Sequence, residues 1–154
     1  MPDTSMKIGE LAAATNTPVD TIRFYEREGL LQPASRTASN YRVYGEAHVE
    51  RLSFIRHCRS LDMALEEIRT LLQFKDAPGG DCAGVNALLD EHIGHVAARI
   101  RELESLQAQL RQLRAQCCEE AAGQECGILR ELAVPVGEPA RREASHVARS
   151  HPRV

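Results

Sequence analysis

The sequence contains no tryptophan, and only three tyrosines and three phenylalanines occur among its 154 residues. This shortage of aromatic side chains argues against a large β-sandwich, whose core is usually rich in them. No apolar run is long enough to cross a bilayer, and the N-terminal stretch MPDTSMKIGE lacks the apolar region of a secretory signal. We therefore expect a cytoplasmic protein with no membrane partner.

Two chemical patterns are also missing. No serine, cysteine or histidine stands in a recognisable nucleophile–base arrangement, so we expect no enzyme activity. The five cysteines are an odd number, and cytoplasmic thiols stay reduced, which favours metal binding or redox sensing over disulfides. A redox sensor needs a resolving pair or an iron–sulfur spacing, and no CxxC motif occurs.

What the chain does contain is enough apolar material for a modest core. The apolar share is 43%, and the length fits one domain, or a small domain with an oligomerising arm. The net charge of −3 conceals a basic stretch, because residues 21–59 hold seven arginines and four glutamates. Such a stretch is typical of a nucleic-acid-binding face, although a solvated helix surface accounts for the charge equally well.

Helical signals begin near the N-terminus, in KIGELAAAT. The following segment, NTPVDTIRFYEREGL, predicts a second helix with Thr17 as its N-cap, Pro18 at its first position and Gly29 as a left-handed stop. Two short helices joined by a tight polar turn predict a helix-turn-helix, a pattern that many helical hairpins share. A recognition helix here would present Thr21, Arg23 and Tyr25 to DNA.

A wing and two further helices follow. In RTASNYRVYGEA, turn-forming residues precede a β-prone stretch, which predicts a hairpin that places Arg36, Arg42 and Tyr44 for phosphate contacts. The segments AHVERLSFIRHC and LEEIRTLLQF have helical periodicity. Cys58 continues the apolar stripe of the first of these by three residues, so we interpret it as a small buried hydrophobe and not a ligand.

Together these segments resemble the DNA-binding half of the MerR family of transcriptional regulators. The resemblance covers roughly residues 6–75 and rests on MKIGELAAATNTPVDTIRFYEREGLL, NYRVY, HVERLSFIRHCRSLDM and LEEIRTLL. It implies a winged helix-turn-helix, a dimer, and activation by distortion of promoter DNA. It also implies DNA contacts from the recognition helix, the wing and the next helix, by Arg23, Tyr25, Arg36, Asn40, Tyr41, Arg42, Arg56 and Arg59.

The second half predicts one long helix with a narrow apolar seam. The seam residues recur every three or four positions. The register shifts at one point, where two successive intervals are both three residues long. A long solitary helix with such a seam needs a partner, so we expect a dimerising coiled coil. The seam consists of Leu89, Ile93, Val96, Ile100, Leu103, Leu106, Leu110 and Leu113.

Three cysteines stand at the two ends of this helix. Cys82 begins it, and Cys117 continues the seam four residues after Leu113. A helix of this span is about 50 Å long, so the two thiols cannot meet within one chain. If two copies pair antiparallel, Cys82 of each meets Cys117 and Cys126 of the other, and the loop CCEEAAGQEC lets Cys126 fold back. The sequence thus predicts two identical sites, each shared between chains.

Three thiolates form a soft site that selects Cu(I), Zn(II) or heavier thiophilic ions. The family resemblance implies more, because a cysteine at the helix start marks its divalent-metal branch. Within that branch, DCAGVNALLDEHIGHVAARI and ECGILREL are most similar to the cadmium and lead regulators. We therefore expect Cd(II) or Pb(II) as the effector, with Zn(II) or Hg(II) as alternatives.

Some residues are candidates for auxiliary ligands only. Two adjacent cysteines, here Cys117 and Cys118, also occur in the zinc regulators of the family. The loop EEAAGQE, however, lacks the histidine that those regulators use. His92 and His95 stand three residues apart, and we interpret them as a polar flank of the coiled coil, with a ligand role as the alternative. His146 and His151 lie in a Pro/Arg/Ser-rich tail that we expect to be disordered. Some cadmium regulators hold a second ion in a His-rich tail, but this tail has only these two histidines.

The hypothesis is a mainly α-helical, metal-responsive regulator that acts as a homodimer on double-stranded promoter DNA with RNA polymerase bound. A metal buffer or chaperone is the competing function, and it leaves the helix-turn-helix and the wing unexplained. The expected organisation is a DNA-binding domain at 1–75, a hinge at 76–84, a dimerisation helix at 85–118, a metal-binding loop and short helix at 119–134, and a tail at 135–154.

Overall fold

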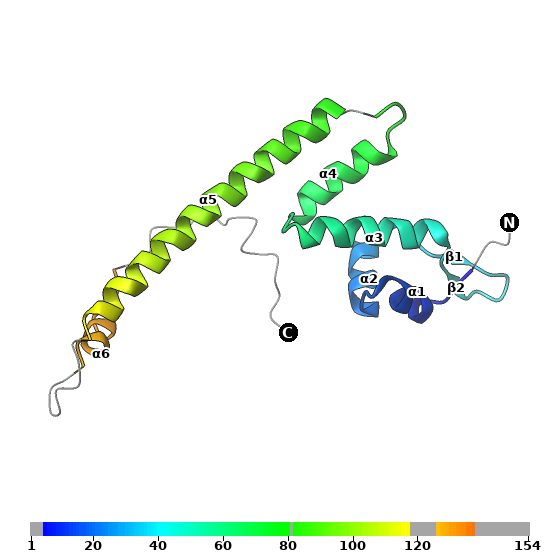
Figure 1. Ribbon diagram of the computed structural model, residues 1–154. Coiled ribbons are helices and arrows are strands. Elements are labelled where there is room, and N and C mark those ends of the chain that lie inside the picture. Colours follow the sequence, from blue (N-terminus) through cyan, green and yellow to red (C-terminus); the bar gives the residue numbers. More distant parts are fainter. Residues whose placement is uncertain (1–4, 81, 118–125, 138–154) are drawn as a thin grey trace. The chain divides into compact units, whose positions relative to one another are not determined.

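The computed structural model describes residues 5–80, 82–117 and 126–137. The chain divides into two compact units, Met1–Val85 and Asn86–Val154, and each is described by itself. Helices dominate the described ranges, and the strands are two short ones (Figure 1). The predicted class, a mainly α-helical protein with a winged helix-turn-helix and a long helix, is confirmed.

The first unit begins with two short helices, α1 (Ile8–Thr15) and α2 (Val19–Arg27). The Glu10 carboxylate accepts the Lys7 backbone N–H at 2.6 Å, which satisfies one of the unpaired donors at the start of α1. Asn16 ends α1 in the left-handed conformation, with φ of 48°. The chain then turns directly into α2, which gives the tight connection of a helix-turn-helix.

The ends of α2 differ in part from the sequence prediction. Gly29 does have a left-handed φ of 69°, as predicted for the stop. The predicted N-cap at Thr17 is wrong, because Pro18 is the N-cap and α2 begins at Val19. The Thr17 side chain is buried, and its hydroxyl donates to the Thr15 carbonyl at 3.1 Å. A hydroxyl already bonded inside the turn leaves the first amides of α2 without a side-chain cap.

The wing is an antiparallel pair of strands, β1 (Ser35–Arg36) and β2 (Arg42–Val43). In its register Ser35 pairs with Val43, and Arg36 pairs with Arg42. The start of the chain joins the base of the wing, because the Met6 N–H donates to the Tyr44 carbonyl at 2.8 Å and the Tyr44 N–H donates to the Met6 carbonyl at 2.9 Å. The wing is therefore fixed at both its turn and its base.

Two longer helices complete this unit, α3 (Glu46–Ser60) and α4 (Leu65–Asp76). Arg51 on α3 connects them to the recognition helix, since its Nε donates to the Leu30 carbonyl at 2.6 Å and its Nη1 pairs with Asp76 at 2.8 Å. Cys58 is buried, as predicted, with 7% of its surface exposed. The core that these elements share consists of Leu11, Ile22, Tyr25, Leu30, Leu31, Tyr44, Leu52, Ile55, Cys58, Met63, Ile68, Leu71 and Leu72.

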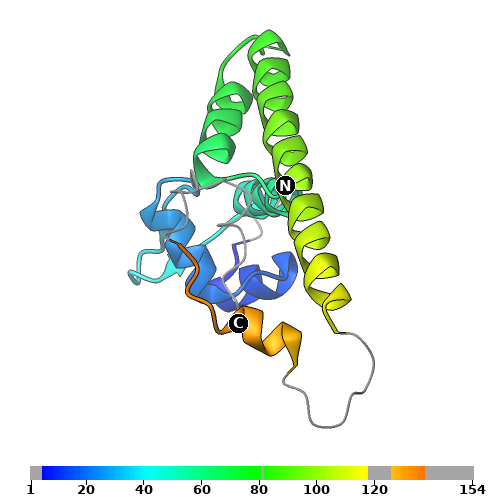
Figure 2. The same ribbon diagram turned by 90° about the vertical axis from the view of Figure 1, so that its left-hand side faces the viewer.

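The second unit consists of most of α5 (Cys82–Ala115) and the short α6 (Gly127–Leu132). Both views show α6 beside the C-terminal end of α5 (Figures 1 and 2). Along α5 the apolar seam is largely uncovered, with Ile93 64% exposed and Leu110 57% exposed. None of the helices in the described ranges is both long and apolar enough to cross a membrane.

Candidate functional site

Exposed basic side chains gather on the recognition helix and the wing. Arg23 projects from α2 into solvent, beside the partly buried Thr21. Arg36 and Arg42 are exposed on paired positions of β1 and β2. A helix flanked by a basic hairpin can place one element in a groove while the other contacts the phosphates. This face is therefore a candidate nucleic-acid interface.

The tip of the wing has internal hydrogen bonds that set its shape. Arg36 Nη1 donates to Asn40 Oδ1 at 2.8 Å, and Asn40 has a left-handed φ of 64°. The Tyr41 N–H donates to the Thr37 hydroxyl at 3.1 Å. These bonds turn Tyr41 outward, where 69% of its surface is exposed. A tip that is already ordered loses little entropy when it meets DNA.

Arg56 and Arg59 of α3 have structural contacts as well as charge. Arg56 Nη1 donates to the Thr15 carbonyl at 2.6 Å, and Arg59 Nη1 donates to the Met63 carbonyl at 3.0 Å. A guanidinium has five N–H donors, so a phosphate contact is compatible with these bonds. The bonds hold both cations next to the end of α1 and the end of α3.

Tyr25 and Tyr44, which the sequence predicts as DNA contacts, are both buried in the chain without DNA. Tyr25 is 6% exposed and Tyr44 is 1% exposed. Burial raises the pKa of Tyr25, and the neighbouring Arg59 and Arg56 oppose that shift. Burial also raises the pKa of Tyr44 to about 12, and the Glu26 carboxylate adds to the effect. Both phenols are part of the buried core of the first unit, and their DNA contacts stay a prediction.

Cys117 and Cys126 are brought together in the second unit. Cys117 lies two residues beyond the last residue of α5, and Cys126 is the N-cap of α6. The Cys117 thiol lies within hydrogen-bonding reach of the Cys126 sulfur. The described cysteines are free thiols. Two soft donors at adjacent helix ends fit a thiophilic metal ion.

The surroundings of Cys126 favour its thiolate. The N–H groups of Leu129 and Ile128 lower its pKa, and the Cys117 thiol lowers it further. Thiolate is the form that binds metal and that reacts as a nucleophile. By contrast, burial raises the pKa of the Cys58 thiol, so Cys58 is poorly suited to either role.

Cys82 is not part of this pair within the chain. It is the first residue of α5, is exposed, and precedes the 117–126 region by the full length of that 34-residue helix. A helix of that length extends over about 50 Å. The predicted auxiliary ligands Cys118, His146 and His151 lie outside the described residues.

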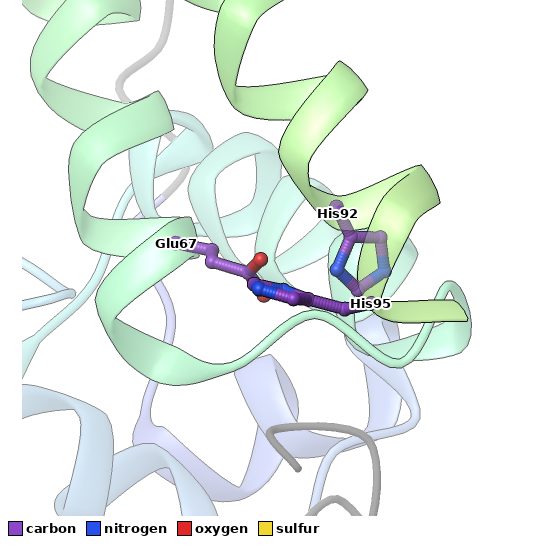
Figure 3. A group of neighbouring side chains, drawn as sticks. All are labelled: Glu67, His92 and His95. Atoms are coloured by element: carbon purple, nitrogen blue, oxygen red, sulfur yellow. The ribbon is translucent and has the colours of Figure 1, made fainter. Parts of the chain in front are cut away.

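The two histidines of α5 are three residues apart, and Figure 3 shows both side chains on that helix. The Nε2 of His95 is 3.9 Å from a Glu91 carboxylate oxygen one turn earlier. Glu67, the third side chain drawn there, belongs to the first unit, where its carboxylate accepts the Ala64 N–H at 2.7 Å and caps α4. Whether His92 and His95 flank a coiled coil stays a prediction.

Sequence reasoning missed three residues that hold α6 against the end of α5. Gln116 Nε2 donates to Glu131 Oε2 at 2.7 Å. A Cβ at Gly127 would stand 3.1 Å from the Gln116 carbonyl oxygen, so the two backbones approach closely there. The only signal in the sequence is position, because Gln116 precedes Cys117 and Gly127 follows Cys126.

Comparison with known proteins bears on both parts of the chain. Residues 6–75 match the family described as MerR HTH family regulatory protein, and residues 49–113 match the one described as MerR, DNA binding. The second match reaches from α3 along most of α5. Family membership therefore includes the long helix as well as the winged domain.

Individual relatives are similar over most of the chain. An HTH-type transcriptional regulator ZntR homolog of Haemophilus influenzae is 49% identical over 109 residues, which cover 71% of this chain and 81% of that protein. The transcription regulator PbrR691 of Ralstonia metallidurans CH34, solved in complex with lead(II), is 48% identical with a TM-score of 0.74, covering 83% of this chain and 99% of that one. A MerR of Bacillus megaterium MB1, solved with mercury(II), is 28% identical with a TM-score of 0.66, covering 82% and 98%.

Proposed function

Because this chain belongs to the MerR family of helix-turn-helix transcription regulators, we propose that it activates metal-resistance genes when a divalent thiophilic ion binds between two protomers. It is a metal-responsive regulator and not an enzyme. Cd(II) or Pb(II) is the proposed effector. The proposed ligands are Cys82 of one protomer with Cys117 and Cys126 of its partner.

The observation that carries the proposal is the approach of the Cys117 and Cys126 thiols at the end of α5. Two thiolates suit a linear site for a monovalent ion, and a divalent ion needs more charge and a higher coordination number. Cys82 is the exposed thiol that remains among the described cysteines once Cys58 is assigned to the core. It reaches the pair if two copies of α5 run antiparallel over about 50 Å.

The exposed seam of α5 supports the homodimer. Its apolar residues recur at three-and-four spacing along the helix, and Ile100, Leu103 and Leu106 are all exposed. Exposed apolar side chains in one stripe cost free energy in water until a second helix covers them. An antiparallel pair covers the seam and brings each Cys82 to the other chain's Cys117 at both ends.

The choice of metal rests on ligand chemistry and on one similar protein. Cd(II) and Pb(II) are soft or borderline ions that three thiolates bind well. The similar regulator PbrR691 was solved with lead(II). Zn(II) and Hg(II) are the alternatives, since both accept thiolates and a more distant MerR was solved with mercury(II). A cytoplasmic metal buffer is the competing function, and the exposed basic wing has no part in it.

The DNA end of the molecule grips a two-fold symmetric promoter site. Arg23 reads bases from α2, and Arg36, Asn40, Tyr41 and Arg42 contact the backbone from the wing. Arg56 and Arg59 add phosphate contacts from α3. Metal binding shifts the dimer toward a form that bends and untwists the DNA, so that bound RNA polymerase starts transcription. That shift is limited by the difference in metal affinity between the two forms.

In vitro transcription from the chain's own promoter, with RNA polymerase and a panel of metal ions, tests the proposal. Transcription should rise with Cd(II) or Pb(II) at lower free concentration than with Zn(II) or Hg(II). The Cys126→Ser variant should bind the promoter and fail to respond. Footprinting without protection of any specific site, together with tight metal binding, would favour the metal buffer instead.

A further inference from the structure

The contact between α6 and the end of α5 involves three residues that are not metal ligands. Gln116 and Glu131 form a hydrogen bond of 2.7 Å across the two helices, between an amide nitrogen and a carboxylate oxygen. Each of these side chains is exposed, so the bond is not required for a core. The bond joins Gln116 to Glu131, and both Cys117 and Cys126 lie between these two residues in the sequence.

The second contact is made by the backbone. Gly127 begins α6, and its Cα approaches Gln116 so closely that a Cβ would lie 3.1 Å from the Gln116 carbonyl oxygen. A side chain there forces its neighbour to move by a few tenths of an ångström. Because Gly127 follows Cys126 and Gln116 precedes Cys117, any displacement passes to the two sulfurs through one peptide unit on each side.

We propose that Gln116, Gly127 and Glu131 are positioning residues that set the separation of the Cys117 and Cys126 sulfurs and thereby the metal affinity of the pair. This inference rests on the proposed function of these cysteines. Metal sites tolerate ligand displacements of only about 0.2 Å, so a shift of a few tenths of an ångström weakens binding. Groups behind the ligands commonly have this orienting role in metal sites.

An exchange of the hydrogen-bonding pair is the sharpest test. Gln116→Glu places two carboxylates against each other and should weaken Cd(II) binding about three- to tenfold, the range for loss of one hydrogen bond. If the added negative charge were the only effect, Cd(II) would bind more tightly. A weaker Cd(II) affinity therefore indicates loss of the positioning hydrogen bond and not the change in charge. The double variant Gln116→Glu/Glu131→Gln restores an amide–carboxylate bond and should return to within about twofold of the wild type. Gln112→Glu, one turn earlier on α5, is the matched control for charge.

Two glycine-to-alanine variants, one at Gly127 and a control at Gly137, provide an independent test. Gly127→Ala should weaken Cd(II) binding by about threefold or more, because the new methyl group meets the Gln116 carbonyl. Alanine favours helix more than glycine does, so weaker binding cannot be attributed to a loss of α6. Gly137→Ala is the control, since a Cβ at Gly137 meets nothing within 4 Å. It should bind Cd(II) like the wild type.

The measurement is an anaerobic titration of the full-length protein with Cd(II) alone against a competing chelator, followed by thiolate-to-metal charge-transfer absorbance. Circular dichroism and operator binding of the metal-free variants show that they are folded. Wild-type affinity in both Gln116→Glu and Gly127→Ala, with loss of binding in Cys117→Ser, would overturn the inference and leave the proposed function standing. Absence of the charge-transfer band in the wild type would instead overturn the proposed function.

Discussion

Individual residues show how the same side chain acquires different chemistry from its surroundings. Cys58 and Cys126 are both free thiols, but Cys58 is packed in the core and Cys126 caps a helix. Burial disfavours the charged thiolate and raises the pKa of Cys58. Backbone N–H groups stabilise the thiolate and lower the pKa of Cys126. Cys126 should therefore be both more reactive and a better metal ligand than Cys58.

Alkylation should separate them. A lowered pKa means a larger thiolate fraction at neutral pH, so the reaction of Cys126 with iodoacetamide should accelerate at a lower pH than that of an ordinary cysteine. The Cys58 reaction should be slow throughout and rise only at higher pH. Peptide-resolved mass spectrometry of metal-free protein between about pH 6 and about pH 9 measures both. Equal rates for the two thiols would contradict the assigned surroundings.

Replacement of Cys58 should affect stability alone. Cys58→Ala removes a buried sulfur and leaves a small cavity, so the free energy of unfolding should fall by about 1 kcal/mol. Cd(II) affinity and metal-induced transcription should stay at wild-type levels. Chemical denaturation and metal titration check the two parts. A folded variant that no longer responds to metal would show that Cys58 is a functional thiol.

Residue-level prediction from the sequence worked where periodicity decided the outcome. Cys58 follows Ile55 by three positions on an apolar stripe, so its burial could be predicted. The burial of Tyr25 and Tyr44 could not, because a phenol is both apolar and polar and suits a core or an interface equally well. The bonds of Arg51 to the Leu30 carbonyl and to the Asp76 carboxylate could not be predicted either, because both partners are distant from Arg51 in the sequence.

At the scale of elements, the recognition helix α2 is only 9 residues long and needs support from its neighbours. Gly29 ends it, and Arg51 from α3 bonds to the Leu30 carbonyl just beyond it. The wing has its own support from the Arg36–Asn40 bond. Each element is thus held in place in the absence of DNA. The contributions of the two elements to DNA binding can therefore be separated by mutation.

Arg23 and Arg42 should have different effects on DNA binding. We propose that Arg23 makes a bidentate base contact, so Arg23→Ala should weaken operator binding by about 1–3 kcal/mol, with little effect on unrelated DNA. The proposed contact of Arg42 is with a phosphate, so Arg42→Ala should weaken binding to all sequences similarly and lower the salt slope by about one. Titrations of operator and scrambled DNA over a range of salt concentrations measure both. Unchanged operator affinity in both variants would remove the assignment of this face.

The seam of α5 gives a second prediction for an element. Leu103 is 49% exposed and Leu110 is 57% exposed, and the double substitution Leu103→Glu/Leu110→Glu puts carboxylates where two helices meet. The variant should sediment as a monomer at concentrations where the wild type is a dimer. Gln107→Glu, at an exposed polar position between them, should remain dimeric. A dimeric double variant would show that this seam is not the interface.

The long helix could be predicted from its apolar period, and its bounds could be predicted only in part. The structure begins α5 at Cys82, the residue predicted to begin the helix, so the segment 76–84 that the sequence suggests as a hinge overlaps the first turn of α5. Gly79 and Gly80 have positive φ angles of 94° and 56°, which explains why a break was visible around them.

For the whole molecule, we propose that each metal site requires two chains. Cys117 and Cys126 lie together, and Cys82 begins the helix whose far end precedes them. A rigid helix of about 50 Å keeps the third thiol away from the pair of its own chain. In the proposed antiparallel dimer this obstacle is absent, because Cys82 of one chain meets the pair of the other.

A mixed dimer tests this claim most directly. Cys82→Ser and Cys117→Ser homodimers should each lose tight Cd(II) binding, because both of their sites lack a thiolate. In the heterodimer of these two variants, one site has both substitutions and the other has an intact set of three cysteines. Titration of the purified heterodimer, followed by charge-transfer absorbance, should recover one tight site per dimer, half the wild-type number. No recovery would mean that each site draws its ligands from a single chain, and it would contradict the account.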